Sequence, residues 1–243
     1  MDWLDETRDG LRVIRPAPAP EGCVVAFSGR GHAPEGEATP TPYLARRLAN
    51  AIGLNGTPIH WARQVHGNTA ATLQDSVPAA SAICAGECDA LVTDQPGTAL
   101  VVQTADCVPI LLAAPGAVGA AHAGWRGTAK AVASTAVAAL AKLGARPAEI
   151  RAWIGPSIGP CCYEVGGEVA AQFAGDFVRA SCGGPFRLDL RAANVAQLTA
   201  AGVPSESIDV HPACTLCGGA SFASYRRDGA RAGRMIALIA RES

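Results

Sequence analysis

Short apolar runs mark the centre of the chain. Ala90–Thr93, Ala99–Val102, Val108–Leu112 and Ala117–Ala121 each hold four or five residues, mostly Ala, Val, Ile and Leu. Runs of this length, without a polar residue at every second position, are typical of strands covered on both faces. We therefore expect several buried strands in this part of the chain.

The spacing of apolar residues changes farther along. They recur every three or four positions, at Val132, Ala136, Val137, Leu140 and Leu143. This period places them on one face of a helix, and the pattern predicts a helix over Thr128–Leu143 that ends at Gly144.

Similar patterns predict the remaining elements. The expected strands are Cys23–Phe27, Ile150–Ile154, Ser207–Val210 and Arg234–Ala240. Further helices are expected at Pro42–Ile52 and from a cap at Asp189 to about Ala200. Residues 1–21, rich in Pro and Ala near their end, are interpreted as a surface arm. Strands and helices mix over residues 22–243, which favours one α/β domain.

Composition limits the possible partners. Apolar residues make up 49% of the chain and the formal net charge is −1, so a large core is possible and no basic surface for nucleic acid is expected. No apolar run is long enough to cross a membrane, and the acidic N-terminus does not resemble a signal peptide. These features favour a cytoplasmic protein. We expect a monomer or small homo-oligomer, although no feature of the sequence specifies the oligomeric state. The nine cysteines are then expected to be reduced thiols, some of them metal ligands.

Three segments place a reactive side chain where an apolar run gives way to a loop. These side chains are His66, Cys107 and His122. Active sites of α/β proteins gather at strand ends, and two imidazoles with one thiolate suit a zinc ion with an open fourth position. The same residues also allow a reaction without metal, in which Cys107 is the nucleophile and His122 its base.

Two further features have competing interpretations. The predicted helix start at Gly127–Thr128, beside Arg126, offers free N–H groups that suit an anion such as phosphate, or Arg126 is a surface residue. The pair Cys214–Cys217 has zinc-knuckle spacing, but Cys161–Cys162 does not match it as a second pair. We interpret Cys214 and Cys217 as packed, reduced thiols.

Five motifs resemble one family. They are Arg63-Gln-Val-His-Gly, Thr104-Ala-Asp-Cys-Val-Pro, Ala121-His-Ala-Gly-Trp-Arg-Gly, Ile154-Gly-Pro-Ser-Ile-Gly-Pro-Cys-Cys-Tyr-Glu-Val and Ser224-Tyr-Arg-Arg. Together, and in this order, they are similar to the laccase-domain family, also called multicopper polyphenol oxidase-like and now described as purine nucleoside phosphorylases. The resemblance extends over roughly Cys23 to Ile239.

The resemblance implies a fold, a metal and an activity. It implies a layered α/β sandwich with mixed sheets, distantly similar to the cytotoxic necrotizing factor catalytic domain. It implies that His66, Cys107 and His122 are the metal ligands and catalytic residues. The implied activities are phosphorolysis of adenosine, inosine and methylthioadenosine, and deamination of adenosine. The candidate substrate-binding residues are Arg30, Arg63, Gln64, Arg126 and Arg226.

Two alternatives remain open. One is a Cys–His amide hydrolase acting on a peptidoglycan precursor or a protein amide. The other is a copper-dependent polyphenol oxidase, which is less favoured because the chain has five histidines and two of them, His32 and His60, lie outside any motif. The family's usual segment after Phe-Ser-Thr-Arg is replaced here by a shorter loop over Gly31–Thr41, so substrate specificity is expected to differ if that loop covers the substrate.

Overall fold

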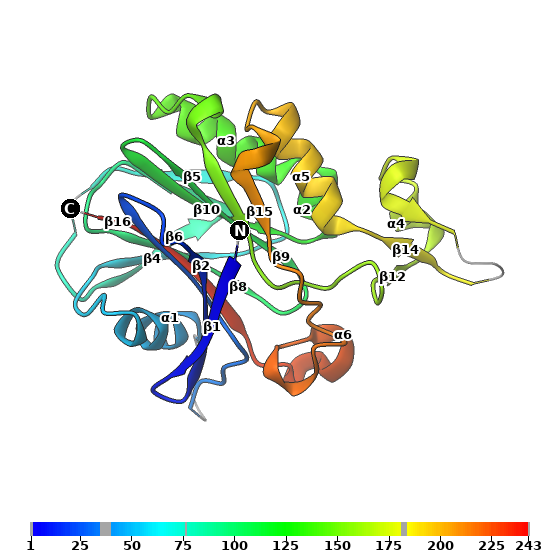
Figure 1. The fold of residues 1–243 in the computed structure, drawn as a ribbon, viewed down its shortest axis with the longest axis horizontal. Coiled ribbons are helices and arrows are strands. Elements are labelled where there is room, and N and C mark those ends of the chain that lie inside the picture. Colours follow the sequence, from blue (N-terminus) through cyan, green and yellow to red (C-terminus); the bar gives the residue numbers. More distant parts are fainter. Residues whose placement is uncertain (1, 35–39, 76, 181–183, 243) are drawn as a thin grey trace.

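The structure is a computed structural model that describes residues 2–34, 40–75, 77–180 and 184–242. It consists of two large mixed sheets stacked face to face, with helices on both outer faces (Figure 1). This arrangement confirms the expected single α/β domain with a layered, mixed-sheet architecture. None of the described helices has the length and apolar character needed to span a membrane.

The first large sheet has seven strands. In spatial order they are β1 (Asp2–Arg8), β2 (Leu11–Ala17), β3 (Cys23–Ser28), β16 (Met235–Arg241), β8 (Ala99–Thr104), β4 (Ile59–Arg63) and β6 (Ala82–Glu87). Strand β4 runs parallel to both β8 and β6, and the other pairs are antiparallel.

The second large sheet has six strands. They are β15 (Ile208–Val210), β11 (Arg151–Ile154), β9 (Val108–Ala114), β10 (Ala117–Ala123), β7 (Ala90–Thr93) and β5 (Ala70–Leu73). The outer pairs β11–β15 and β5–β7 are parallel, and the inner pairs are antiparallel.

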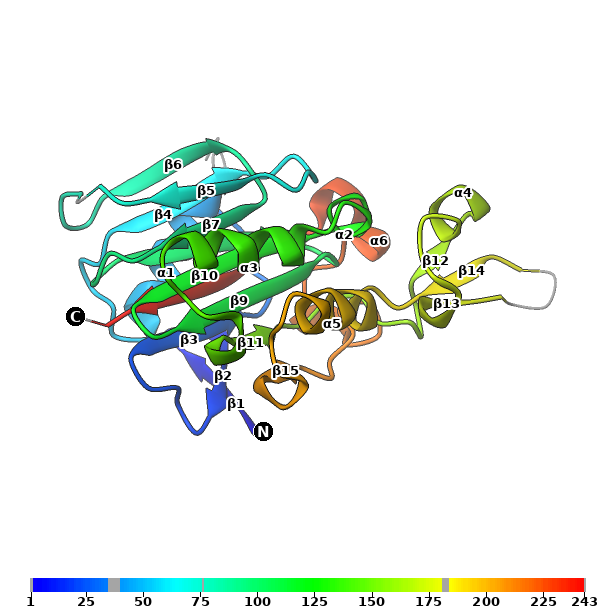
Figure 2. The same ribbon diagram turned by 90° about the horizontal axis from the view of Figure 1, so that it is seen from above.

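A third, small sheet lies at one end of the molecule. Its strands are β12 (Glu164–Val165), β14 (Phe186–Leu188) and β13 (Val178–Arg179). Figures 1 and 2 both show it with α4 (Gly167–Ala170), beyond the ends of the two stacked sheets.

Alternating side chains of the strands fill three separate layers of core. Leu100 and Val102 of β8 pack between the sheets with Leu111, Val118 and Trp153 of the second sheet. The opposite face of β8 packs on α1 (Pro40–Ala51). The opposite face of the second sheet packs on α3 (Val132–Lys142) and α5 (Leu190–Ala200). Because both faces of each sheet are covered, the central strands read as continuous apolar runs.

Several expected elements occur close to their predicted limits. Asp189 caps α5 through a 3.0 Å hydrogen bond from the Ala192 backbone N–H, and α5 ends at Ala200 as predicted. The helix expected over Thr128–Leu143 is instead two helices, α2 (Trp125–Ala129) and α3. The break is local, because Ala131 has φ +60°, a left-handed conformation that no helix continues through.

The N-terminal residues also differ from expectation. Residues 2–17 are not a free arm, because β1 and β2 form an antiparallel hairpin that extends the first sheet. Leu11, Val13 and Ile14 of β2 are buried, and this burial holds the segment in place. The remaining short elements are α6 (Tyr225–Asp228) and 3-10 turns at Pro147–Glu149, Gly175–Phe177, Ser205–Ser207, Gly219–Ser221 and Gly229–Arg231.

Candidate active site

A cavity of about 560 Å³ lies where the ends of β4, β8, β9 and β10 meet. His66, Cys107 and His122 all line it. The three ligand atoms of these residues lie within 4.8 Å of one another, although the residues are 15 to 56 positions apart in the sequence. Pockets of roughly 300–1,000 Å³ are typical of sites for small molecules.

The two histidines approach the site from different backbone settings. His122 is the sixth residue of β10 and is 3% exposed. His66 lies in the loop after β4 and has φ +58°, an uncommon conformation for a residue with a side chain. Such a conformation persists only where surrounding contacts hold it.

Asp89 holds both histidines. Its Oδ1 accepts hydrogen bonds from His122 Nδ1 at 2.8 Å and from the His66 backbone N–H at 3.1 Å. Its Oδ2 accepts from the backbone N–H groups of Gly67 at 2.6 Å and Val65 at 3.2 Å. The bond to Asp89 keeps a proton on His122 Nδ1, so Nε2 is the nitrogen that can bind a metal or take up a second proton.

Cys107 and His122 form a charged pair. Burial would raise the pKa of Cys107, but the positive charge of His122 and hydrogen bonds from His122 and His66 outweigh it and lower this pKa to about 6. Burial would lower the pKa of His122, but the Cys107 thiolate and Asp89 raise it to about 9. At neutral pH the metal-free site therefore holds a thiolate beside an imidazolium.

The donor set suits a single metal ion. A thiolate sulfur and two imidazole nitrogens are the ligands of catalytic zinc sites, and a cavity beside them leaves a fourth position open. Gly124 provides the room, because a Cβ at this position would lie 2.9 Å from His66 Cδ2 and 3.0 Å from Cys107 Sγ. The residues present fit a zinc ion.

Asp106 fixes the loop that carries Cys107. It has φ +84°, and its carboxylate accepts hydrogen bonds from the hydroxyl groups of Thr215 at 2.6 Å and Ser224 at 3.1 Å. It also accepts from the Arg226 backbone N–H at 2.7 Å. Asp106 therefore links Cys107 to two segments more than 100 positions later in the chain.

Three arginines line the cavity: Arg126, Arg226 and Arg234. The ion pairs among the described residues involve other arginines, so these three guanidinium groups have no carboxylate partner there. The Arg126 guanidinium lies 4.3 Å from the ring centre of Trp125. The cavity wall therefore carries positive charge that suits an anionic ligand.

Two predicted substrate-binding arginines do not line this cavity. Arg30 pairs with Asp228 at 3.3 Å, and the exposed Arg63 pairs with Glu87 at 3.1 Å. Arg63 is the last residue of β4 and Arg30 lies in the loop after β3, and each guanidinium binds a carboxylate that the local sequence does not indicate.

Gln64 lines the cavity but its amide is already bonded. Its Nε2 donates to the Gln103 carbonyl and its Oε1 accepts from the Gln103 N–H, both at 2.8 Å. This side chain ties the loop after β4 to β8.

The predicted anion site at Thr128 is not present as expected. Helix α2 begins at Trp125, and the Thr128 N–H donates to the Gly124 carbonyl at 2.8 Å. Thr128 is also fully buried. Its N–H group is therefore not available to a ligand in the cavity, and arginine side chains remain the candidates for holding an anion.

The interpretation of Cys214 and Cys217 also changes. The structure brings this pair together with Cys161 and Cys162, and the four Sγ atoms lie within 4.8 Å of one another. Sequence spacing did not indicate this, because the two pairs lie in loops that meet only in the folded chain.

Sequence reasoning missed Asp89, Gly124 and Arg234. The sequence could have indicated Asp89, because this residue directly precedes the buried strand β7, and the other reactive residues also lie at strand ends. Arg234 directly precedes β16. The shorter loop over Gly31–Thr41 falls partly outside the described residues.

The chain is similar in sequence to one protein family and to several named prokaryotic proteins. Residues 44–242 match the family described as multi-copper polyphenol oxidoreductase laccase. A purine nucleoside phosphorylase of Deinococcus radiodurans is 44% identical over 199 residues, which cover 79% of this chain and 74% of that one. An adenosine deaminase named RL5, from an unknown prokaryotic organism, is 44% identical over 163 residues, covering 63% and 62% of the two chains.

The fold also matches a solved structure. The crystal structure of YlmD from Geobacillus stearothermophilus superposes with a TM-score of 0.83 at 33% sequence identity, covering 100% of both chains.

Proposed function

The chain belongs to the multi-copper polyphenol oxidoreductase laccase family, and on that premise we propose that it is a zinc-dependent purine nucleoside phosphorylase that also deaminates adenosine. The proposed substrates are adenosine, inosine and methylthioadenosine, together with phosphate. The names of its relatives support both activities.

The proposed metal ligands are His66, Cys107 and His122. Asp89 keeps a proton of His122 on Nδ1 and so leaves Nε2 as the nitrogen that would bind the ion. A zinc ion held by these three residues would supply Lewis acidity and would make water more acidic, which is the chemistry that deamination at the purine C6 requires.

The observation that carries the phosphorylase proposal is the set of guanidinium groups beside the ligand trio that have no carboxylate partner among the described residues. Phosphate must sit next to the anomeric carbon while the purine leaves, and Arg126, Arg226 or Arg234 can grip it with parallel hydrogen bonds. Trp125, Tyr163 and Tyr225 also line the cavity and offer flat faces for a base.

The test measures products with and without phosphate. With inosine as substrate, ribose 1-phosphate and free base are expected to form together, and only when phosphate is present. Deamination is expected to convert adenosine to inosine without phosphate. The Cys107→Ser variant should lose zinc and both activities, whereas the exposed Cys84→Ser is the matched control. Equal base release in phosphate-free buffer contradicts the phosphorylase assignment.

One observation favours a second candidate, the Cys–His amide hydrolase. In the metal-free site Cys107, His122 and Asp89 have the order of a nucleophile, a base and an orienting carboxylate, and the pKa of Cys107 is lowered to about 6. A metal-free hydrolase keeps its activity in a chelator and loses it on thiol alkylation. The zinc enzyme is expected to lose activity in the chelator and to recover it with added zinc.

Copper oxidation of phenols is the weaker alternative. A multicopper centre requires several copper ions and many imidazoles, whereas the candidate metal groups in the described part of the chain contain two histidines in total.

A further inference from the structure

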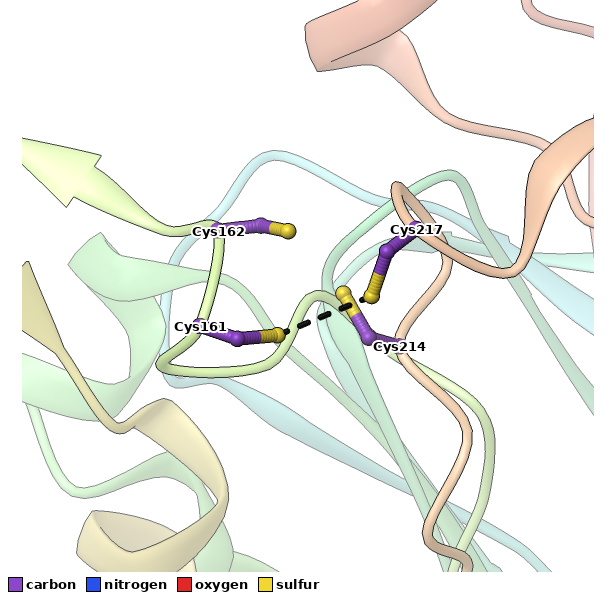
Figure 3. A group of neighbouring side chains, drawn as sticks. All are labelled: Cys161, Cys162, Cys214 and Cys217. Carbon is purple, nitrogen blue, oxygen red and sulfur yellow. Dashed lines mark hydrogen bonds between the residues drawn. The ribbon is translucent and has the colours of Figure 1, made fainter.

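Two loops meet beside the active-site wall and bring four thiols together. Residues 155–163 follow β11, and residues 211–218 follow β15. Because β11 and β15 are parallel neighbours, the loops leave the same edge of the sheet side by side. Figure 3 shows that the first loop contributes two of the four side chains and the second loop the other two: Cys161, Cys162, Cys214 and Cys217.

Backbone contacts also hold the two loops together, in addition to contacts made by the thiols. Ser157 pairs with Cys214 in an isolated parallel bridge, and its carbonyl accepts from the Thr215 N–H at 3.0 Å. The Gly159 N–H donates to Cys214 Sγ at 3.2 Å. The thiols are therefore held in place before any ligand binds.

A buried arginine completes this connection. Arg191 of α5 is 9% exposed and donates to Ser157 Oγ at 2.8 Å and to the Ser157 carbonyl. It also donates to carbonyl groups of the second loop, at His211 (3.2 Å), Pro212 (3.1 Å) and Ala213 (2.5 Å). One guanidinium thus connects both loops and places a positive charge near Cys161, Cys214 and Cys217.

The sulfur separations fit a single tetrahedral ion. All four Sγ atoms lie within 4.8 Å of one another, and Cys161 Sγ lies 3.7 Å from Cys217 Sγ. A tetrahedral zinc site with Zn–S bonds of about 2.3 Å places neighbouring sulfurs about 3.8 Å apart. A disulfide requires about 2.05 Å. Figure 3 shows the four side chains directed toward a common space.

We propose that Cys161, Cys162, Cys214 and Cys217 bind a second zinc ion, distinct from the one proposed in the cavity. Four protein thiolates fill the coordination sphere, so this site is structural. The ion carries two positive charges and the thiolates four negative ones, and the Arg191 guanidinium and the N–H group of Gly159 offset part of the excess.

The site has a consequence for the cavity. Thr215 lies between Cys214 and Cys217, and its hydroxyl donates to Asp106 at 2.6 Å. Asp106 is the neighbour of Cys107 in sequence and accepts from the Arg226 N–H. Zinc at the four-cysteine site would therefore add to the contacts that hold the loop supporting both a ligand of the first metal and an arginine of the cavity.

The test isolates this site by removing the first one. In a Cys107→Ser chain purified without oxygen, about one equivalent of Co²⁺ or Zn²⁺ is expected to bind. The Co²⁺ form is expected to show strong thiolate-to-metal absorption in the near ultraviolet. In this variant the cavity site retains only His66 and His122, and without the Cys107 thiolate it cannot produce that band. This result is independent of whether the cavity zinc or the phosphorylase activity is correct.

Variants assign the band to the cluster. Adding Cys161→Ser and Cys217→Ser to this chain is expected to abolish the absorption band and to lower the Co²⁺ affinity by more than about 100-fold. Losing a residue that only hydrogen-bonds to a ligand already lowers metal affinity by roughly 10–100-fold, and here two ligands themselves are lost. Adding Cys84→Ser, another exposed cysteine, should change neither.

A measurement on the unaltered protein guards against variants that fail to fold. Bound Zn²⁺ is expected to protect the four cysteines from alkylation, as read by mass spectrometry, while Cys84 reacts. The proposal is overturned if the Cys107→Ser chain binds no ion, if the band survives loss of Cys161 and Cys217, or if the anaerobically purified protein contains a disulfide among the four.

Discussion

Replacing Asp89 with asparagine tests how the site is assembled. An asparagine amide has one acceptor oxygen, whereas the Asp89 carboxylate accepts with two. If the amide oxygen takes the place of Oδ1, the NH₂ group faces the N–H groups of Gly67 and Val65 and leaves both without an acceptor. If it takes the place of Oδ2, the NH₂ group faces His122 Nδ1 and the His66 N–H.

Each orientation has a calculable effect. Two unpaired backbone donors cost about 1–3 kcal/mol each, and even the lower total of about 2 kcal/mol lowers the melting temperature by roughly 4–8 °C in a chain of this size. In the second orientation the His122 proton moves to Nε2, which then cannot bind the metal. Loss of such an orienting partner typically reduces metal affinity by about 10–100-fold.

The assay combines calorimetry with competition for zinc by a chromophoric chelator. Asp89→Asn is expected to lower the melting temperature if its oxygen replaces Oδ1, and to lower the zinc affinity if its oxygen replaces Oδ2. Asp94→Asn, at a turn carboxylate outside the cavity, is the control. A variant that keeps both its melting temperature and its zinc affinity would refute the claim that Asp89 holds the loop after β4 and orients His122.

Three further predictions concern other parts of the structure. Gly124→Ala is expected to reduce zinc occupancy, because its Cβ would lie 2.9 Å from His66 Cδ2; unchanged zinc content by elemental analysis would contradict this. Arg226→Lys is expected to raise the phosphate KM by about 10-fold or more, for a lost contact of roughly 1.5–3 kcal/mol, and the nucleoside KM less; the surface variant Arg146→Lys should change neither. Burial and the nearby Arg191 guanidinium lower the pKa of His211 from 6.5 to about 4, so the free energy of unfolding should fall by about 3 kcal/mol as the pH drops from 6.5 to 4. Denaturant titrations of His211→Gln should show a smaller fall over the same pH range. An equal fall would refute the assignment to His211.

The local sequence pattern was sufficient to predict elements that depend on only a few adjacent residues. Strand β7 spans the predicted Ala90–Thr93, and Asp189 caps α5 as expected, because a buried strand and a helix cap both depend on a few adjacent residues. The hairpin of β1 and β2 was not predicted, because β1 is mostly charged and the Pro-rich stretch begins at the end of β2. Its stability comes from packing on the rest of the first sheet.

The site shows the same division. The residue types in the motifs around His66, Cys107 and His122 are by themselves enough to indicate metal or thiolate chemistry. The arginines were less predictable. Arg30 and Arg63 lie in or beside motifs, but they pair with carboxylates and do not line the cavity, whereas Arg234, outside the recognised motifs, lines it.

The amino-acid pattern is sufficient to predict the apolar runs, the helix cap and the reactive residues at strand ends. Which distant residues meet depends on how the whole chain folds. Folding brings Asp89 into hydrogen-bond contact with both histidines, and it brings Cys161 and Cys162 close to Cys214 and Cys217. The physical reason is that strand and helix patterns are read over a few residues, whereas these contacts arise from the order in which strands pair. That order is set by burial of both sheets' faces at once, and no short segment of the chain contains it.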